Sequence, residues 1–242
     1  MESIARDSRI IESGIIMEHG TDSSKQVPYE IVFLNPDDLD QILELQNIIV
    51  ANLNDWDLFR FDDYDYWRNH FTIEDSVMGV RVENRLIAYH VFSVPIHISK
   101  NLGHAIGLSP DNLSKVAHLE TVGVHPAFNG NHLQQKMLGH TLKVLFQKNY
   151  LHICATVSPR NHRSLETLFG FGFTIKGFAS MYQGRLRAIV YKNLEVTRCP
   201  QCAEPIEVHA DDIEKQEQLH QMGYAGFQMK QLEDGVGFVY GK

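Results

Sequence analysis

The stretch Leu119-Glu-Thr-Val-Gly-Val-His-Pro-Ala-Phe-Asn-Gly-Asn-His-Leu-Gln-Gln-Lys-Met-Leu138 joins an apolar strand, a polar turn and an amphipathic helix. This order of elements places free backbone N–H groups at the positive end of a helix, where they can bind a phosphate. We therefore predict a strand over 116–124, a helix beginning at Leu133, and an anion-binding turn over 129–134 between them.

The segments around this stretch predict a mixed fold of strands and helices. An apolar run over 152–157 follows the helix, and a strand, a helix and a strand in this order form a crossover whose two strands run parallel. Upstream, the apolar segments 77–82 and 86–94 predict an antiparallel hairpin across Glu83-Asn84-Arg85. The remaining predicted elements are a strand over 29–34, a helix capped by Asn35 with Pro36 in its first turn, a helix over 163–169, strands over 173–178 and 187–194, a tail helix opened by Asp211 and Glu214, and a hairpin of 226–230 with 236–240.

The length and composition restrict the class of protein. The chain has 242 residues, three cysteines and a formal net charge of −8. Three cysteines are too few for a disulfide framework and no secretory signal pattern is visible, so we expect a cytoplasmic protein. The sequence contains no run of about eighteen apolar residues, so we expect no membrane span. The negative charge argues against a nucleic-acid partner, because duplex binding depends on Lys and Arg contacts with phosphates.

The pattern along the chain suggests three parts. Residues 1–27 carry scattered apolar residues and then a polar run, so we expect a loosely ordered leader. Residues 28–197 hold the strands and helices of the main domain, and residues 198–242 form a helix–hairpin extension packed on it. Cys199 and Cys202 have the spacing of half a zinc ribbon, but a second pair is missing, so we expect no metal. A redox thiol pair is an equally unsupported alternative.

A second motif completes the evidence for a family. Asn161-His-Arg-Ser-Leu-Glu-Thr-Leu-Phe-Gly-Phe-Gly-Phe173 begins about forty residues after the start of the first stretch, and together the two resemble the GNAT superfamily of acetyl-CoA-dependent N-acetyltransferases. The segments 155–159, 182–187 and 223–226 are similar to those of a subgroup of bacterial acetyltransferases. The resemblance implies an α/β (α+β) fold with a mixed, mostly antiparallel sheet, a central parallel strand pair, and helices on both faces.

The resemblance also implies a binding site for acetyl-CoA as co-substrate. The family's loop reads Arg or Gln, two residues, Gly, one residue, then Gly or Ala, and the marked positions fall on Asn129, His132 and Gln134, which all depart from it. Glycine lets a phosphate approach the backbone closely, so its replacement by His132 could weaken coenzyme binding. Among residues other than glycine, however, Asn and His best tolerate a positive φ. The coenzyme-binding residues so implied are Val122, Gly123, Val124, Asn129, Gly130, Asn131, His132, Leu133, Gln134, Asn161 and Ser164. Each of these residues also has a purely structural interpretation. The valines could pack in the core, the loop could be a capped turn between strand and helix, and Asn161 and Ser164 could cap a short helix.

Acetyl transfer from a thioester needs an acceptor for the proton of the amine, and Glu120 is the candidate base. Its alternative role is that of a solvent-facing strand residue. His118 is a second candidate acceptor, ranked lower. The family often places a Tyr seven residues after the Asn of the second motif, where this chain has Leu168, so Tyr182 is the candidate that could supply the hydroxyl or line the acceptor pocket.

The acceptor is expected to be an amine that carries positive charge. In Asn54–Trp67, five carboxylates alternate with aromatic residues that could hold an amine by charge and by cation–π contact, although a solvated acidic surface gives the same pattern. Two functions remain open. The first is an N-acetyltransferase that modifies a primary amine of a small molecule or peptide, and the second is an impaired module that binds acyl-CoA or a protein partner. A homodimer is one assembly that the sequence leaves open.

Overall fold

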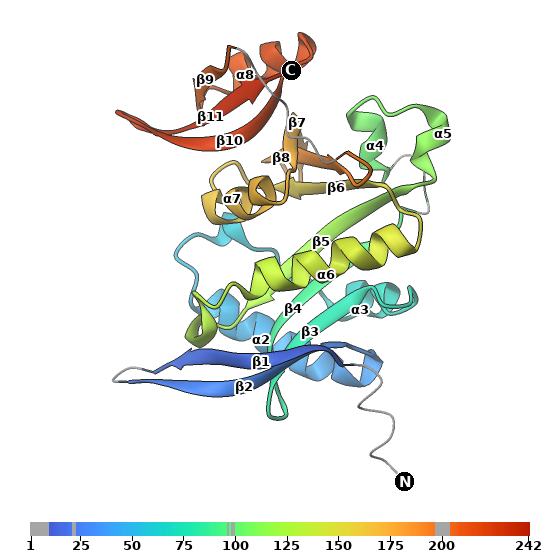
Figure 1. Ribbon diagram of the computed structural model, residues 1–242, viewed down its shortest axis with the longest axis vertical. Helices are drawn as coiled ribbons and strands as arrows, with labels where there is room; N and C mark the ends of the chain where they lie inside the picture. Colours follow the sequence, from blue (N-terminus) through green and yellow to red (C-terminus); the bar gives the residue numbers. More distant parts are fainter. Residues whose placement is uncertain (1–9, 21–22, 96, 98–99, 197–203) are drawn as a thin grey trace. The chain divides into compact units, whose positions relative to one another are not determined.

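The computed structural model describes residues 10–20, 23–95, 97, 100–196 and 204–242, without the side chain of Trp56 (Figure 1). The chain divides into two compact units. Unit 1 comprises residues 1–93 and 120–144, and unit 2 comprises residues 94–119 and 145–242.

The sheet of unit 1 is built from antiparallel neighbours. β1 (Ile10–His19) pairs with β2 (Ser24–Phe33) from Ile10↔Val32 to His19↔Ser24, and the two strands run side by side in blue in Figure 1. β2 pairs with β3 (Val77–Val82), which forms the predicted hairpin with β4 (Arg85–Ser93). The last residues of β5 (Val116–Val124), from Glu120 on, also belong to this unit.

Helices cover both faces of this sheet, because alternate strand residues point to opposite sides. On one face, Phe128, Leu133 and Met137 from the 3-10 helix η4 (Pro126–Phe128) and from α6 (Leu133–Gln147) pack on strand residues such as Ile31 and Val80. The other face is covered by α2 (Leu39–Ala51) and α3 (Tyr64–His70). The core residues of that second face include Val32, Leu34, Ile42, Leu45, Trp67, Val77 and Tyr89.

The 3-10 turn that leads into α2 confirms the predicted cap. Asn35 precedes the 3-10 helix η1 (Pro36–Asp38), and its side-chain oxygen accepts from the N–H of Asp37 at 2.9 Å. In return, the N–H of Asn35 donates to the carboxylate of Asp38 at 2.9 Å. This reciprocal capping satisfies N–H groups that a helix start otherwise leaves open.

Unit 2 contains the parallel pair that the sequence predicts. The first residues of β5 pair in parallel with β6 (His152–Val157), from Val116↔His152 to Leu119↔Ala155. Antiparallel pairing then links β6 with β8, β8 with β7, β7 with β10, β10 with β11, and β11 with β9. These strands are β7 (Thr174–Met181), β8 (Arg185–Asn193), β9 (Ile206–His209), β10 (Ala225–Leu232) and β11 (Gly235–Gly241), and the helices are α4 (Leu102–Ala105), α5 (Pro110–Leu113), α7 (His162–Gly170) and α8 (Ile213–Gln221). The predicted α+β fold class is confirmed.

Two local predictions are corrected. The expected loosely ordered leader over 1–27 is wrong for its described part, because residues 10–19 form β1 and 24–27 begin β2. The tail helix is capped by Asp212, whose side chain accepts from the N–H of Lys215 at 3.0 Å, instead of by Asp211. The predicted limits of the main domain at 28–197 and of the extension at 198–242 remain predictions.

Two further expectations concern metals and membranes. Cys199 and Cys202 lie outside the described residues, and within the described ranges no group of three or more His, Cys, Asp or Glu side chains is placed to hold a metal ion. No helix in the described part of the chain has the length and apolar character that crossing a membrane requires.

Candidate functional site

The predicted phosphate turn has an unusual backbone. Gly130 has φ of 85° and His132 has φ of 57°, so both adopt the left-handed conformation. A Cβ added at Gly130 would meet no atom within 4 Å, so the conformation, and not the available space, favours glycine there. His132 adopts a similar conformation with a side chain that tolerates it, which keeps the turn open without the glycine of the family pattern.

The first turn of α6 contains backbone N–H groups that have no acceptor within the helix itself. The N–H of Lys136 donates to the carbonyl of His132 at 3.0 Å, and it is preceded by the N–H groups of 133–135, for which the helix itself has no acceptor. The side chain of His132 is exposed, and its Nδ1 lies 2.5 Å from Oε1 of Gln135. The imidazole is therefore held against the first turn of α6 by Gln135.

Asn131 ties the turn to β1. Its Oδ1 accepts from the N–H of Met17 at 2.8 Å, and its Nδ2 donates to the carbonyl of Met17 at 2.7 Å and to that of Phe128 at 3.0 Å. These bonds use the side-chain amide as a structural link, so the backbone is the part of Asn131 left to contact a coenzyme.

A carboxylate on β1 reinforces this link. Oε1 of Glu12 accepts from the Tyr29 hydroxyl at 2.5 Å and from Nζ of Lys136 at 2.7 Å, while Oε2 lies 2.7 Å from Nε2 of His140. The hydrogen bond from Lys136 and then that from Tyr29 lower the pKa of Glu12 to about 2. We call these contacts of Glu12, together with the Met17–Asn131 bonds, the β1 anchor.

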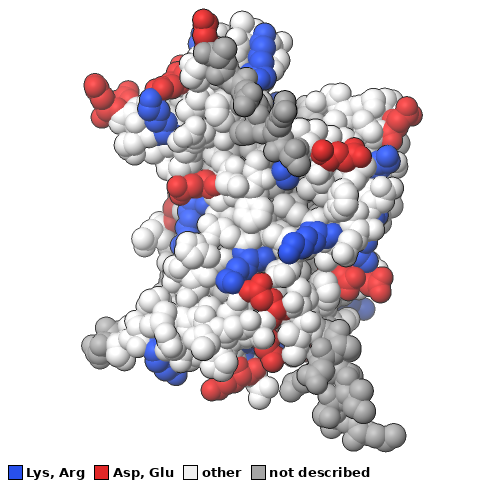
Figure 2. Space-filling model, viewed as in Figure 1, with Lys and Arg blue, Asp and Glu red and all other residues white. Residues whose placement is uncertain are grey.

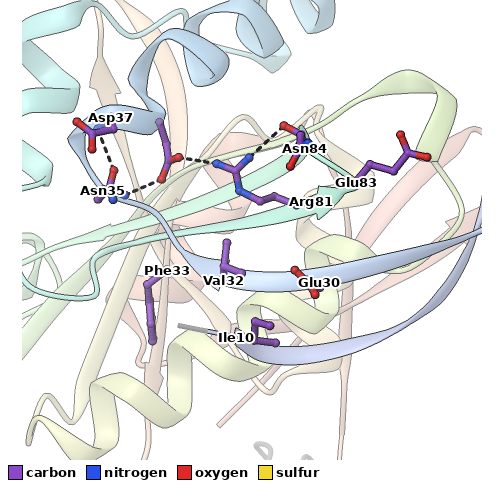
Figure 3. A pocket seen from close by; sticks show the side chains of 10 residues that line it. Ile10, Glu30, Val32, Phe33, Asn35, Asp37, Arg81, Glu83 and Asn84 are labelled. Atoms are coloured by element: carbon purple, nitrogen blue, oxygen red, sulfur yellow. Dashed lines mark hydrogen bonds and ion pairs between the residues drawn. The ribbon is translucent and has the colours of Figure 1, made fainter. Parts of the chain in front are cut away.

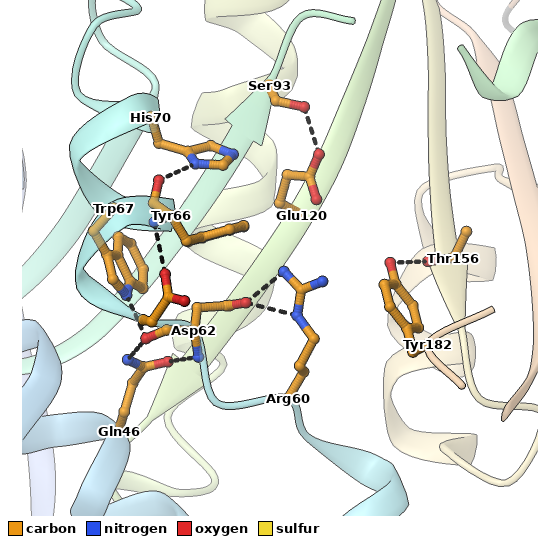
Figure 4. A network of polar contacts seen from close by, with 11 residues as sticks. Gln46, Arg60, Asp62, Tyr66, Trp67, His70, Ser93, Glu120, Thr156 and Tyr182 are labelled. Atoms are coloured by element: carbon orange, nitrogen blue, oxygen red, sulfur yellow. Dashed lines mark hydrogen bonds and ion pairs between the residues drawn. The ribbon is translucent and has the colours of Figure 1, made fainter. Parts of the chain in front are cut away.

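The candidate base Glu120 lies on β5 at the point where the strand changes from fully buried to more exposed residues. It follows four buried residues, Val116–Leu119, and its own side chain is exposed. Its Oε1 accepts a hydrogen bond from the hydroxyl of Ser93 at the end of β4 (Figure 4). An exposed carboxylate with one hydroxyl partner keeps lone pairs available for a proton.

A second carboxylate, Asp62, is buried near Glu120. The backbone of Asp62 exchanges two hydrogen bonds with the buried side chain of Gln46, at 2.8 and 3.0 Å, and its carbonyl accepts from the Trp67 indole at 3.2 Å (Figure 4). Its Oδ1 accepts from Nε of Arg60 at 2.6 Å, whereas Oδ2 has no hydrogen-bond partner among the described residues. Burial raises the pKa of Asp62 to about 6, Arg60 opposes the rise, and Glu120 adds to it.

Two tyrosine hydroxyls complete this group. The ring of Tyr66 lies between the His70 ring, at 4.0 Å between centroids, and the guanidinium of Arg60, at 5.1 Å. Figure 4 shows Tyr66 reaching from α3 toward Glu120, and burial and then Glu120 raise its pKa. Burial, followed by the charge of Asp62, also raises the pKa of Tyr89.

Neither hydroxyl has a hydrogen-bond partner of ordinary geometry in the described part of the chain. The side chain of Thr121 nevertheless interacts with the Tyr89 hydroxyl and partly opposes the rise in its pKa. The Tyr89 ring fits because Gly123 has no side chain: a Cβ there would lie 2.7 Å from two ring atoms. We call Asp62, Tyr66 and Tyr89 the Asp62 cluster.

The structure separates the carboxylates of the acidic and aromatic segment that the sequence analysis singled out. Within Asn54–Trp67, Asp55 and Asp63 are helix caps that accept from the N–H groups of Asp57 and Tyr66, both at 2.9 Å. Asp62 is the member that is buried, at 3% exposure. The acidic and aromatic pattern was the available signal for Asp62 and Tyr66, while Tyr89 looked like any core residue of an apolar strand.

The remaining predicted residues of unit 2 have local structural contacts. Asn161 caps α7, and its Oδ1 accepts from the N–H of Ser164 at 3.1 Å. The Tyr182 hydroxyl lies 3.3 Å from Oγ1 of Thr156, a pair that Figure 4 also draws. Nε2 of His118 accepts from the N–H of Leu102 at 3.1 Å, which gives this buried histidine a structural role. Leu168 is buried.

In unit 1, Val122 and Val124 are partly buried and pack against the core that includes Phe128 and Met137. This is the ordinary role expected of valine in a strand. The parallel register with β6 ends at Leu119, so it does not include the backbone of 122–124.

A cavity of about 330 Å³ lies elsewhere in unit 1 (Figure 3). Arg81, in its wall, is bonded to the carboxylate of Asp38 at 2.5 Å and to the carbonyl of Asn84 at 3.2 Å. Asn35 and Asp37 are engaged in the cap of η1. Asp38 accepts from both Asn35 and Arg81, so the polar groups on this side of the cavity bind one another.

Charged side chains of both signs lie on one face of the molecule. On the face drawn in Figure 2, the described Lys and Arg side chains lie scattered among Asp and Glu side chains instead of forming one basic area.

Comparisons with known proteins agree with this architecture. Among solved structures, the chain is similar to yncA from Salmonella typhimurium, solved with its cofactor acetyl-CoA, at 18% identity and a TM-score of 0.52 over 72% of this chain and 98% of that one. It is similar to the ribosomal-protein-S5-alanine acetyltransferase from Vibrio fischeri at 16% identity and a TM-score of 0.53, covering 70% and 95%. Naa50 of Arabidopsis thaliana, in complex with the bisubstrate analogue CoA-Ac-MVNAL, matches at 15% identity and a TM-score of 0.51, covering 68% and 98%.

These structural likenesses show the fold. No curated protein matches the chain. Residues 42–173, more than half of the chain, match the acetyltransferase (GNAT) family, and they include β5, the phosphate turn, Glu120 and the Asp62 cluster. The chain therefore belongs to the GNAT family of acetyltransferases.

Proposed function

We propose that this protein is an N-acetyltransferase that moves the acetyl group of acetyl-CoA to a primary amine of a small molecule or peptide. The observation that carries the proposal is the exposed carboxylate of Glu120 beside the Asp62 cluster, on the strand that leads into the phosphate turn. The family supplies acetyl transfer, and this arrangement supplies a proton acceptor for an amine.

The coenzyme is proposed to bind along β5 and the turn that follows. The backbone N–H groups of 130–135 are the donors for its diphosphate, at the positive end of α6. The backbone of 122–124 is the partner for the pantetheine arm, and Asn161 and Ser164 remain candidates in unit 2. The relative solved with acetyl-CoA supports this choice of co-substrate.

In the proposed reaction, the neutral amine attacks the thioester carbonyl directly. A C–N bond forms, the C–S bond breaks, and the coenzyme leaves as a thiolate, while the proton lost by the amine passes to Glu120. A thiol has a pKa of about 8.5, so the thiolate can leave without an acid. Tyr182 is the candidate that could protonate it, since position 168 is a leucine.

A second function is supported by specific substitutions. Asn129, His132 and Gln134 replace the marked positions of the family loop, and Leu168 replaces the usual hydroxyl. These changes favour an impaired module that binds acyl-CoA or a protein partner. The left-handed backbone of His132 favours the enzyme, because the turn keeps the path that glycine would give it.

Finer assignments belong to the same proposal. The Asn-x-x-Ser pattern at 161–164 and the Tyr-x-Gly-x-x-Arg pattern at 182–187 support a place in the bacterial subgroup. The low cysteine content supports a cytoplasmic location.

The test is release of free thiol from acetyl-CoA in the presence of a panel of primary amines. We expect Glu120→Gln to lower kcat by about 100-fold, because general-base catalysis contributes at least that much, and to leave the unfolding midpoint unchanged. Glu44→Gln, at an exposed position on α2, is the matched control. Equal rates for Glu120→Gln and wild type would remove Glu120 from the mechanism. Coenzyme binding without thiol release for any amine would favour the binding module.

A further inference from the structure

We propose that Arg60 is a displaceable occupant of a cation site, and that the ammonium group of the acceptor replaces its guanidinium on Asp62 and Tyr66. The inference rests on the proposed function and names the form in which the acceptor first binds. In this proposal Asp62 positions the ammonium group of the acceptor, and Arg60 occupies the site until the acceptor displaces it.

The two partners of the Arg60–Asp62 pair differ sharply in exposure. The side chain of Asp62 is 2% exposed and that of Arg60 is 40% exposed. Gln46 and Trp67 hold the backbone of Asp62 in place. An exposed guanidinium on a long side chain is solvated easily, whereas a buried carboxylate needs a cation near it. Arg60 can therefore leave at small cost only if another cation takes its place.

The surroundings of the guanidinium suit a smaller cation. Arg60 lies against the Tyr66 ring, and an ammonium ion binds the same face of an aromatic ring. An ammonium group has three donors, and the site offers both oxygens of Asp62 and the lone pairs of two phenols.

Three of those atoms, Oδ2 of Asp62 and the hydroxyls of Tyr66 and Tyr89, have no hydrogen-bond partner within the described residues. Buried polar atoms without partners are costly, and such a group in a native structure suggests a ligand or solvent that completes it. The side chains of Asp62 and Tyr89 are more than nine-tenths buried, so the cluster is a built site rather than an acidic surface.

The charge and the position both connect this site to Glu120. The charge of Glu120 acts on Tyr66 and on Asp62. Exchange of one cation for another keeps the local charge balanced. The ammonium N–H bond then breaks, and the proton moves to a carboxylate oxygen of Glu120 and from this exposed side chain to solvent. The lone pair of the nitrogen becomes available for attack, and Glu120 is ionised again when the attacking amine loses its second proton.

The experiment measures binding without turnover. Butylammonium is titrated into the full-length protein by calorimetry in the absence of acetyl-CoA, with butanol as the uncharged probe of matched shape. We expect wild type to bind butylammonium and to ignore butanol. Arg60→Ala should bind butylammonium about tenfold more tightly, because nothing has to be displaced.

The variants that remove the site should have the opposite effect. Asp62→Asn and Tyr66→Phe are expected to weaken butylammonium binding at least tenfold and to raise KM for butylamine, while Asp65→Asn and Tyr64→Phe, at exposed positions on α3, change neither. Weaker binding in Arg60→Ala, or equal binding in Asp62→Asn and wild type, would overturn the proposal and leave Arg60 as a structural ion pair. If the protein transfers acetyl groups but fails this binding test, the proposed function stands and the cation site is refuted. If it binds butylammonium but transfers no acetyl group, the cation site stands and the proposed function is refuted.

Discussion

The β1 anchor and the Asp62 cluster are both built around a carboxylate in unit 1, but they treat it in opposite ways. Both oxygens of Glu12 have partners, from Tyr29, Lys136 and His140, and its pKa falls to about 2. Among the residues that the structure describes, one oxygen of Asp62 and the hydroxyls of Tyr66 and Tyr89 have no hydrogen-bond partner, and the pKa of Asp62 rises to about 6. The difference indicates that the anchor stabilises the fold, whereas the cluster keeps buried polar atoms of the kind that the proposed cation site requires.

The largest expected effect on stability is at the anchor. Glu12→Gln removes the charge that three partners share, and we expect a loss of about 2 kcal/mol in the free energy of unfolding at pH 7. The folded-state pKa is below the usual 4.5, so this stability is present above pH 4.5 and is lost as the pH falls toward 2. Urea unfolding of both proteins at neutral and low pH measures it. An unchanged midpoint at pH 7 would mean that solvent screens the cluster completely.

A smaller effect is expected at the second half of the anchor. Asn131→Ala removes two bonds to the backbone of Met17, and we expect a loss of about 1.5 kcal/mol in the free energy of unfolding. The turn over 129–132 should also become less well positioned, so acetyl-CoA should bind several-fold more weakly by calorimetry. Asn69→Ala, at an exposed position on α3, is the matched control. Unchanged coenzyme affinity in a destabilised Asn131→Ala would separate the anchor from the phosphate turn.

The smallest effect has the opposite sign. Asp62→Asn removes a buried charge, so we expect a gain of about 1 kcal/mol in the free energy of unfolding at pH 7. The folded-state pKa is raised from 3.8 to about 6, so the native protein binds the proton more tightly than the unfolded chain does. The favourable contribution of Asp62 is thus present below pH 3.8 and lost as the pH rises through 6. The gain should vanish in urea unfolding at about pH 4, and a loss at pH 7 would place Asp62 with Glu12 as a stabilising residue.

The predictable parts of this molecule were those with local signals. The strand over 116–124, the strand over 152–157 and the helix start at Leu133 match β5, β6 and α6, because each is an apolar run or stripe bounded by polar residues. The cap at Asn35 follows from a side chain that acts within its own turn.

The missed parts depend on contacts between distant segments. β1 is interrupted by Gly14, which hides its strand pattern, and the reason lies in β2: a Cβ at Gly14 would stand 2.9 Å from a ring carbon of Tyr29. In the same way, the sequence showed five carboxylates over 54–67 and could not tell that Gln46, on α2, would hold Asp62 in the interior. The sequence shows which segment is rich in carboxylates, but only the folded structure shows which of those carboxylates is buried.

The left-handed backbone at His132 limits how this segment can drift during evolution. A β-branched residue there would be strained, whereas Gly, Asn, Asp and His can follow the same path at low cost. A lineage can therefore lose the glycine and still inherit the geometry, provided that it moves through this small set of residues. The feature inherited at this position is the left-handed backbone conformation. A search for divergent family members should therefore accept any residue that tolerates this conformation, instead of requiring glycine.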